Sequence, residues 1–291
     1  GQMWIGIGLA LGTAANWIFV AKRLRKFSSA AGDAITVPQY LGNRFLSKSN
    51  ALQVICAIIF FVCFTIYVAS AYVAGASVFT AIFPSLSSHA AMIIFALAML
   101  LITFFGGFKA VCWTDFFQGI LMFAALMTVP IVIAITKDMD PAALSVVYSY
   151  KDAVSGEMVE CSFGTGLFDA SWQDIISGLA WGLGYFGMPH ILVRFMSIEK
   201  PSMVKKSATV AIIWVICALG CACLIAYFGR MFLAEELLTA GAQKMVFIDF
   251  ARKLFPSFIA GILMAAIIAA SMSTADSQLL VASSSFTSDI Y

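Results

Sequence analysis

One carboxylate interrupts the most apolar part of the C-terminal sequence. Asp276 is the only charged residue between Leu254 and Ser288, and the 22 residues of 254–275 contain no Lys, Arg, Asp or Glu. A run of this length crosses a bilayer as a helix, where a carboxylate costs about 2.5–3.5 kcal/mol to insert. The carboxylate is therefore expected to meet a partner, a water-filled cavity or an ion.

Residues with side-chain oxygens surround this carboxylate. Ser273, Asp276 and Ser277 are spaced i, i+3 and i+4, so a helix places them on one face. Hydroxyl, carboxylate and carbonyl oxygens suit a small hard cation. Two interpretations stay open at this point: a cation site inside a membrane bundle, or a hydrogen bond between Asp276 and a neighbouring helix that holds the two helices together.

A second unusual stretch, 181–190, contains three glycines and a proline within an apolar run. Pro189 removes a helical hydrogen bond, and each glycine weakens a helix. In lipid the freed backbone groups must be satisfied by protein, water or ligand. A break here therefore indicates a bundle interior or a cavity. The alternative is a proline kink with glycines that allow close packing.

Aromatic and acidic residues near these stretches have open roles. Trp181 and Tyr185 are i and i+4, which predicts one shared helix face, either for a small amphiphilic ligand or for anchoring at the membrane interface. Tyr67 lies mid-span, where its hydroxyl needs a cavity or another helix. Asp115 follows the turn signal of 106–109, which favours a helix N-cap.

Composition indicates an integral membrane protein. The chain is 62% hydrophobic and 11% charged, whereas soluble domains carry about 25% charged residues. The net charge of +2 leaves no basic footprint for nucleic acid. The cysteines and the two histidines lack metal-ligand spacing. No nucleophile–base pair is evident, so we expect neither an enzyme nor an organic cofactor.

Charge-free runs and turn signals predict seven transmembrane helices in a single transporter domain. Their approximate ranges are 1–21, 50–83, 90–111, 115–136, 173–196, 207–229 and 257–288. Loops on one side hold 11 of the 17 Lys and Arg residues, which predicts that this side is cytoplasmic. Residue 1 is then outside and Tyr291 cytoplasmic. Because the sequence starts within an apolar run, we expect an internal segment of a longer protein.

Several specific stretches occur in one order along the chain. They are TVPQYLGNRF (36–45), FTIYVASAYVAGA (64–76), GGFKAVCWTDFFQG (106–119), WGLGYFGMPHILVRF (181–195) and AGILMAAIIAASMSTADSQLLVASSS (260–285). In these stretches the chain resembles the sodium/solute symporter family. The resemblance implies an all-α integral membrane fold whose seven spans are core helices two to eight of an inverted-repeat, five-plus-five transporter core. The first, ninth and tenth core helices are then expected outside this chain.

The resemblance also implies binding residues. The positions that match half of the main sodium site are Ala270 (through its carbonyl), Ser273 and Thr274. Some members hold a second sodium at the positions that match Asp115, Asp276 and Ser277. The positions that match the solute site are Trp181, Tyr185, Pro189 and Tyr67. Met188 stands where proline carriers of the family have Gln, which leaves solute selectivity open.

The implied function is sodium-coupled symport of a small amino acid, with L-proline expected, by alternating access in the prokaryotic cell (inner) membrane. Sodium is the coupling ion, and the partners are sodium, the solute and the bilayer. The alternatives are a symporter for another solute, such as pantothenate or a sugar, and the membrane sensor domain of a signalling protein. A seven-helix retinal protein would need a lysine in the last span, and none follows Lys253.

Overall fold

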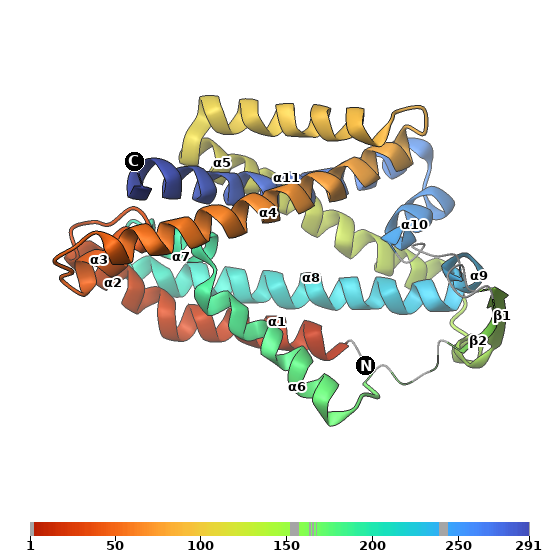
Figure 1. Cartoon of the computed structure of the whole chain (residues 1–291). Helices are drawn as coiled ribbons and strands as arrows, with labels where there is room; N and C mark the ends of the chain where they lie inside the picture. The colour runs from red at the N-terminus through yellow and green to blue at the C-terminus, as the bar shows by residue number, and fades with distance from the viewer. Residues whose placement is uncertain are drawn as a thin grey trace. The chain divides into compact units, whose positions relative to one another are not determined.

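The structure is a computed structural model of the chain, and it describes residues 3–151, 157–162, 164, 166, 168–238 and 244–290. Most of these residues are helical (Figure 1). The predicted positions of residue 1 outside and Tyr291 in the cytoplasm concern residues that are not among those described.

The helices follow one another with short connections. In chain order they are α1 (Met3–Ala15), η1 (Asn16–Ala21), α2 (Lys22–Ala30), α3 (Val37–Arg44), α4 (Ala51–Ile82), α5 (Ser88–Thr136), η2 (Pro141–Ser145), α6 (Trp172–Ala180), η3 (Trp181–Gly187), α7 (Pro189–Met196), η4 (Pro201–Met203), α8 (Val204–Phe232), α9 (Ala234–Leu237), α10 (Val246–Leu254), α11 (Ser257–Ser284) and η6 (Ser285–Ile290). The short segments η1 and η6 are π-helical, whereas η2, η3 and η4 are 3-10 helices.

A β-hairpin lies between α5 and α6. Strands β1 (Val147–Lys151) and β2 (Met158–Ser162) pair antiparallel, with Val147 opposite Ser162. The prediction of a purely helical chain is incomplete here, because a five-residue strand carries too little periodicity to stand out from a loop.

Five helical stretches of the described chain are long and apolar enough to cross a membrane, and a bent pair, Trp172–Gly187 with Pro189–Met196, makes a possible sixth. The difference from the seven predicted crossings arises at α5, which runs through 49 residues. A straight helix of this length would extend about 74 Å, more than twice the roughly 30 Å of a hydrocarbon core.

Gly107 divides α5 into two helices. Its φ of 56° and ψ of −160° are non-helical and essentially restricted to glycine. The yellow ribbon reverses direction at this break (Figure 1). The break falls inside the corner that the sequence predicts at 106–109, and the count of seven crossings stays a prediction.

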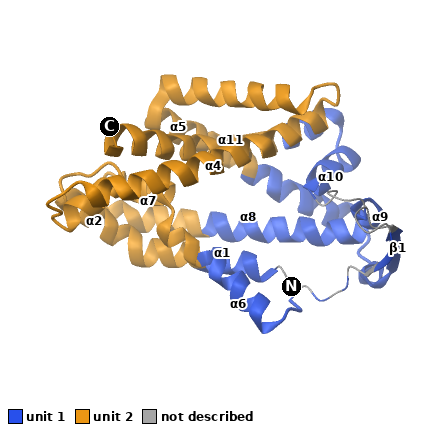
Figure 2. Cartoon of the chain, in the orientation of Figure 1, with its two compact units in different colours: residues 1–11, 123–182, 213–264 blue, residues 12–122, 183–212, 265–291 orange. Residues whose placement is uncertain are grey.

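The chain forms two compact units (Figure 2). Unit 1 comprises residues 1–11, 123–182 and 213–264, and unit 2 comprises residues 12–122, 183–212 and 265–291. In unit 1, α1 and α6 approach closely. A Cβ added at Gly8 would lie only 2.5 Å from the carbonyl oxygen of Gly178. Small residues permit such contacts between membrane helices.

Unit 2 holds most of the predicted site residues. One buried cluster joins the first span and α7 through Ala21, Leu24 and Phe195, and another joins α5 and α11 through Phe95 and Ala275. These clusters fix the helices from which the polar side chains of the site project.

A polar contact secures the N-terminus of α3 in unit 2. The hydroxyl of Thr36 accepts from the Gln39 N–H as an N-cap and donates to Asp289 Oδ1 over 2.7 Å. Gln53 Nε2 donates to the same oxygen over 2.9 Å. The end of the last span is thereby joined to α3 and α4.

Candidate functional site

Three predicted cation-binding residues form a group of oxygens on α11. Ser273 Oγ donates to the carbonyl oxygen of Ala270 over 3.0 Å, and Thr274 Oγ1 donates to the same oxygen over 3.1 Å. Each hydroxyl directs its proton along the helix, so its lone pairs remain available to a cation. The two hydroxyl oxygens can therefore serve as ligands of a hard cation that completes its shell with other groups, whereas the Ala270 carbonyl already accepts two hydrogen bonds from them.

Asp276 lies in the C-terminal half of α11 and is fully buried. Its Oδ1 accepts a hydrogen bond from Thr103 Oγ1 on α5 over 3.1 Å. Its Oδ2 has no hydrogen-bond partner among the described residues. The hydrogen bond between Asp276 and a neighbouring helix is therefore present. The second carboxylate oxygen, Oδ2, remains available to a cation. Sequence reasoning did not find Thr103, because one threonine in an apolar run gives no periodic signal.

Asp115 and Ser277 meet between α5 and α11. Ser277 Oγ lies 3.2 Å from Asp115 Oδ2 and 3.0 Å from the carbonyl oxygen of Ser273, and its one proton can serve only one of them at a time. Arg194 of α7 pairs with the Asp115 carboxylate and hydrogen-bonds to Ser277 through the same Nη2 atom. A guanidinium thus contacts two of the three residues that the resemblance links to a second sodium.

The N-cap interpretation of Asp115 is wrong. The second helix of α5 starts at the break at Gly107, so Asp115 lies about two turns inside it. Its carboxylate contacts α7 and α11 instead of its own helix terminus. Sequence reasoning counted Arg194 only among the basic residues at one end of a span, and the structure adds it to the site.

The fifth span is interrupted as the sequence predicts. The segment Trp181–Gly187 is a 3-10 helix, Met188 is extended, and α7 begins at Pro189. Pro189 therefore occupies the first helical position, where its missing N–H removes no helical bond, and the expected loss of a mid-helix hydrogen bond is wrong. Because a 3-10 helix repeats every three residues, the expected shared face of Trp181 and Tyr185 is also wrong.

The predicted solute residues are divided between the units. Trp181 belongs to unit 1 and is exposed, whereas Tyr67, Tyr185 and Pro189 belong to unit 2. The ring of Tyr67 stacks with that of Phe64, with centroids 6.2 Å apart. Unit 2 therefore holds Tyr67, Tyr185 and Pro189 without Trp181.

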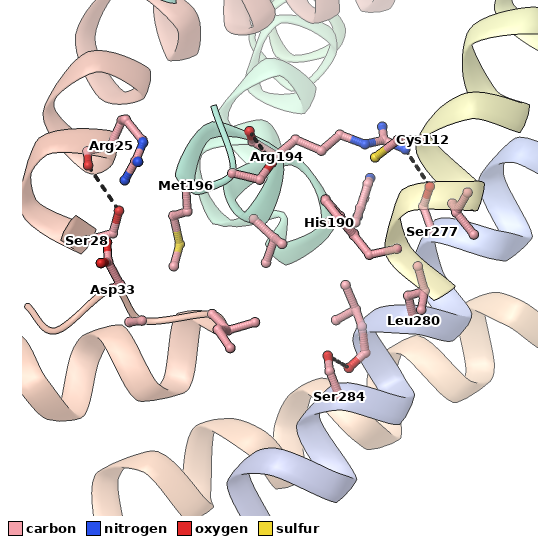
Figure 3. Close-up of a pocket in the computed structure, with 17 residues that line it drawn as sticks. Arg25, Ser28, Asp33, Cys112, His190, Arg194, Met196, Ser277, Leu280 and Ser284 are labelled. Atoms are coloured by element: carbon pink, nitrogen blue, oxygen red, sulfur yellow. Dashed lines mark hydrogen bonds between the residues drawn. The ribbon is translucent and has the colours of Figure 1, made fainter. Parts of the chain in front are cut away.

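A cavity of about 430 Å³ lies in unit 2 (Figure 3). The polar side chains that line it are Arg25, Ser28, Asp33, Cys112, His190, Arg194, Ser197, Ser277 and Ser284. In Figure 3 the Arg194 side chain extends toward Ser277, and Arg25 and Ser28 lie on the opposite side. The cavity therefore reaches one predicted cation residue, Ser277, and none of the predicted solute residues.

Comparisons with known proteins agree with the resemblance seen in the sequence. The profile described as Sodium:solute symporter family matches residues 1–291. The sodium/proline symporter 2 of Staphylococcus saprophyticus is 39% identical over 289 residues, which cover 99% of this chain and 54% of that protein. The sodium/proline symporter of Staphylococcus aureus is 40% identical over 289 residues, again with 99% and 54% covered. The chain spans about half the length of the curated relatives it matches. With the broken fifth span and the oxygen-rich last span on the same chain, these matches show that it belongs to the sodium:solute symporter family.

Proposed function

We propose that this chain is part of a sodium-coupled symporter of the cell membrane that carries a small amino acid, with L-proline as the solute. Membership in the family and the similarity to the sodium/proline symporters of Staphylococcus support this choice. The inverted-repeat core with seven crossings, and the orientation with residue 1 outside and Tyr291 inside, belong to the same proposal. The charge asymmetry of the loops supports the orientation.

One observation carries the coupling mechanism. Arg194 belongs to the second half of the broken span, and its guanidinium contacts Ser277 on the helix with the proposed cation residues. A change at the cation residues can therefore be transmitted directly to the broken span. Alternating access requires such a link, because sodium and solute must each favour the conformation that binds the other.

The proposed roles follow from the residue chemistry. One sodium is bound by oxygens of Ala270, Ser273 and Thr274. A second cation region is formed by Asp115, Asp276 and Ser277, and the guanidinium of Arg194 pairs with the Asp115 carboxylate there. The proposed solute residues are Trp181, Tyr185, Pro189 and Tyr67. Aromatic rings with polar tips suit a zwitterion that has an apolar ring. Sodium then moves down its gradient and draws the solute inward.

The test uses the full-length parent protein in proteoliposomes. Ser273→Ala and Thr274→Ala each remove one proposed sodium ligand, so the sodium concentration for half-maximal proline uptake should rise about 5- to 30-fold, as expected for one lost interaction of about 1–2 kcal/mol. Thr128→Ala is the matched control, because its exposed hydroxyl also donates to a helical carbonyl, that of Ala124, over 2.7 Å. Unchanged sodium activation in both site variants would remove the assignment.

A second measurement identifies the solute. Uptake of labelled proline is competed with unlabelled proline, pantothenate and a sugar. We expect unlabelled proline alone to compete. Stronger competition by pantothenate or the sugar would show that this compound, and not proline, is the solute.

A further inference from the structure

Asn16, in the first span, is a buried polar residue to which no role has been given so far. It begins the π-helical segment η1, and only 1% of its surface is exposed. π-Helical turns within α-helices occur frequently at functional sites. The side-chain amide has two donor hydrogens and one acceptor oxygen that need partners when buried.

The broken fifth span fixes one end of this amide. Asn16 Nδ2 donates to the backbone carbonyl of Tyr185 over 2.8 Å. Tyr185 lies in the 3-10 segment Trp181–Gly187, where the backbone departs from the α-helical hydrogen-bond pattern. Because a carbonyl cannot donate, the nitrogen of the amide must face Tyr185, and the orientation of the whole amide follows.

The other end of the amide is unsatisfied. Asn16 Oδ1 is buried and has no hydrogen-bond partner among the described residues. A buried acceptor without a partner destabilises the folded chain, and the bilayer interior offers no bulk water to satisfy it. A ligand with an N–H donor would satisfy it.

The same part of the first span also contacts the side chain of Tyr185. Thr13 lies one turn before Asn16, and its hydroxyl lies near the side chain of Tyr185. The first span therefore approaches Tyr185 both at its backbone carbonyl and at its side chain. Tyr185 is a proposed solute residue, and Asn16 is hydrogen-bonded to it. The unpaired oxygen of Asn16 therefore lies beside the proposed solute site.

We propose that Asn16 belongs to the solute site and that its Oδ1 accepts a hydrogen bond from the ammonium group of a small zwitterionic solute. This inference rests on the proposed function. A hydrogen bond from a charged donor is stronger than one from a neutral donor, and the neutral amide avoids burying a further carboxylate in the membrane. Through Nδ2 the same side chain also links solute binding to the broken span at Tyr185.

The test compares two ligands on the full-length parent protein at saturating sodium. L-proline has an ammonium N–H, and tetrahydrofuran-2-carboxylate has a ring oxygen in its place. Asn16→Leu should weaken proline binding about 10- to 100-fold, as expected for a lost bond to a charged group, and should leave binding of the analogue unchanged. Affinities are measured by competition against labelled proline.

Asn43→Leu is the matched control. Asn43 also donates from Nδ2 to a backbone carbonyl, that of Ala31, over 2.7 Å, but it lies at an exposed position. This variant should bind both ligands as the parent does. A change in solute affinity there would mean that loss of any such bond disturbs the site.

Three outcomes overturn the proposal. An equal loss for proline and the analogue would show that Asn16 acts through packing, and weaker sodium binding without solute would assign Oδ1 to the ion. If Asn16→Leu does not fold, Asn16→Ala with the same ligand pair gives the same reading, because alanine also lacks a side-chain acceptor. Absence of proline binding in the unmodified parent would contradict the proposed function itself, and this inference with it. If the parent binds proline, the comparison of the two ligands tests the role of Asn16 alone.

Discussion

The carboxylate of Asp115 and the hydroxyl of Ser277 are 162 positions apart in sequence, yet their oxygens lie 3.2 Å apart. Arg194 contacts both groups with one guanidinium nitrogen. The Asp115 side chain is 16% exposed and that of Arg194 is 43% exposed, so the pair is only partly screened by solvent. In this cluster the guanidinium of Arg194, from the broken span, neutralises the carboxylate of Asp115.

Removing the guanidinium of Arg194 should increase the stabilisation of the protein by sodium. Arg194→Gln leaves the Asp115 carboxylate without its ion pair, and sodium can then neutralise it. We expect the melting temperature of the purified parent protein to rise more with sodium in this variant than in the unmodified protein, because a ligand that binds the folded state stabilises it. Potassium keeps the ionic strength constant.

The double variant Asp115→Asn/Arg194→Gln is the control for this prediction, since it removes both charges. Its melting temperature should respond to sodium less than that of Arg194→Gln. Equal sodium responses in the single and double variants would mean that Asp115 does not receive the ion.

Gly107 provides a test of the turn inside α5. Its backbone conformation is essentially restricted to glycine, so Gly107→Ala should destabilise the protein by about 1–3 kcal/mol. Gly119→Ala is the control on the same element, because an added Cβ there meets no atom within 4 Å. Thermal unfolding of the purified parent protein in detergent measures both. A melting temperature for Gly107→Ala as high as that of Gly119→Ala would argue against a turn at this position.

Sequence reasoning predicted the buried carboxylate of Asp276 and the interrupted fifth span, because a charge in an apolar run and a cluster of glycines are local signals. It also placed the turn at 106–109. It failed where the result depends on which distant residues meet. Nothing local indicates that Thr103 reaches Asp276 or that Asn16 reaches Tyr185, since each partner lies more than 160 positions away.

The errors of local geometry have a different cause. The i, i+4 argument for Trp181 and Tyr185 assumed an α-helix in the stretch where the glycines and Pro189 favour another conformation. The N-cap argument for Asp115 assumed that a helix starts at the first charge-free residue, whereas it starts at Gly107.

An exposed ion pair in unit 1 gives a prediction for pH. The hydrogen bond from Lys253 to Glu236 lowers the pKa of that carboxyl below its ordinary value of 4.5. A carboxyl whose pKa is lower in the folded state stabilises that state above its unfolded pKa, and the effect is lost as pH falls through the folded pKa. Both side chains are about half exposed, so the contribution is small.

Lys253→Gln should therefore melt slightly below the parent protein at pH 7, and the difference should vanish well below pH 4.5. High salt should reduce the difference at pH 7, because surface charges are screened. A difference of the same size at both pH values would show that Lys253 acts through packing instead of charge.

The approach of α1 and α6 in unit 1 can be tested with two glycines of one helix. A Cβ added at Gly8 would lie 2.5 Å from the carbonyl oxygen of Gly178 and 2.7 Å from the Cα of Leu179. These are backbone atoms, so neither can move aside as a flexible side chain would. At Gly6 the nearest atom is Cys223 Sγ at 3.5 Å, which is ordinary contact.

Alanine improves helix propensity at both positions by up to about 1 kcal/mol, so propensity alone predicts that both variants are stabilised. Overpacking at Gly8 adds a cost of about 1–3 kcal/mol, and only the contact with α6 distinguishes the two sites. We therefore expect Gly8→Ala to lower the melting temperature of the parent protein and Gly6→Ala to leave it unchanged or raise it. If both variants melted alike, the two helices would not be in backbone contact at Gly8, and the packing described for unit 1 would be wrong.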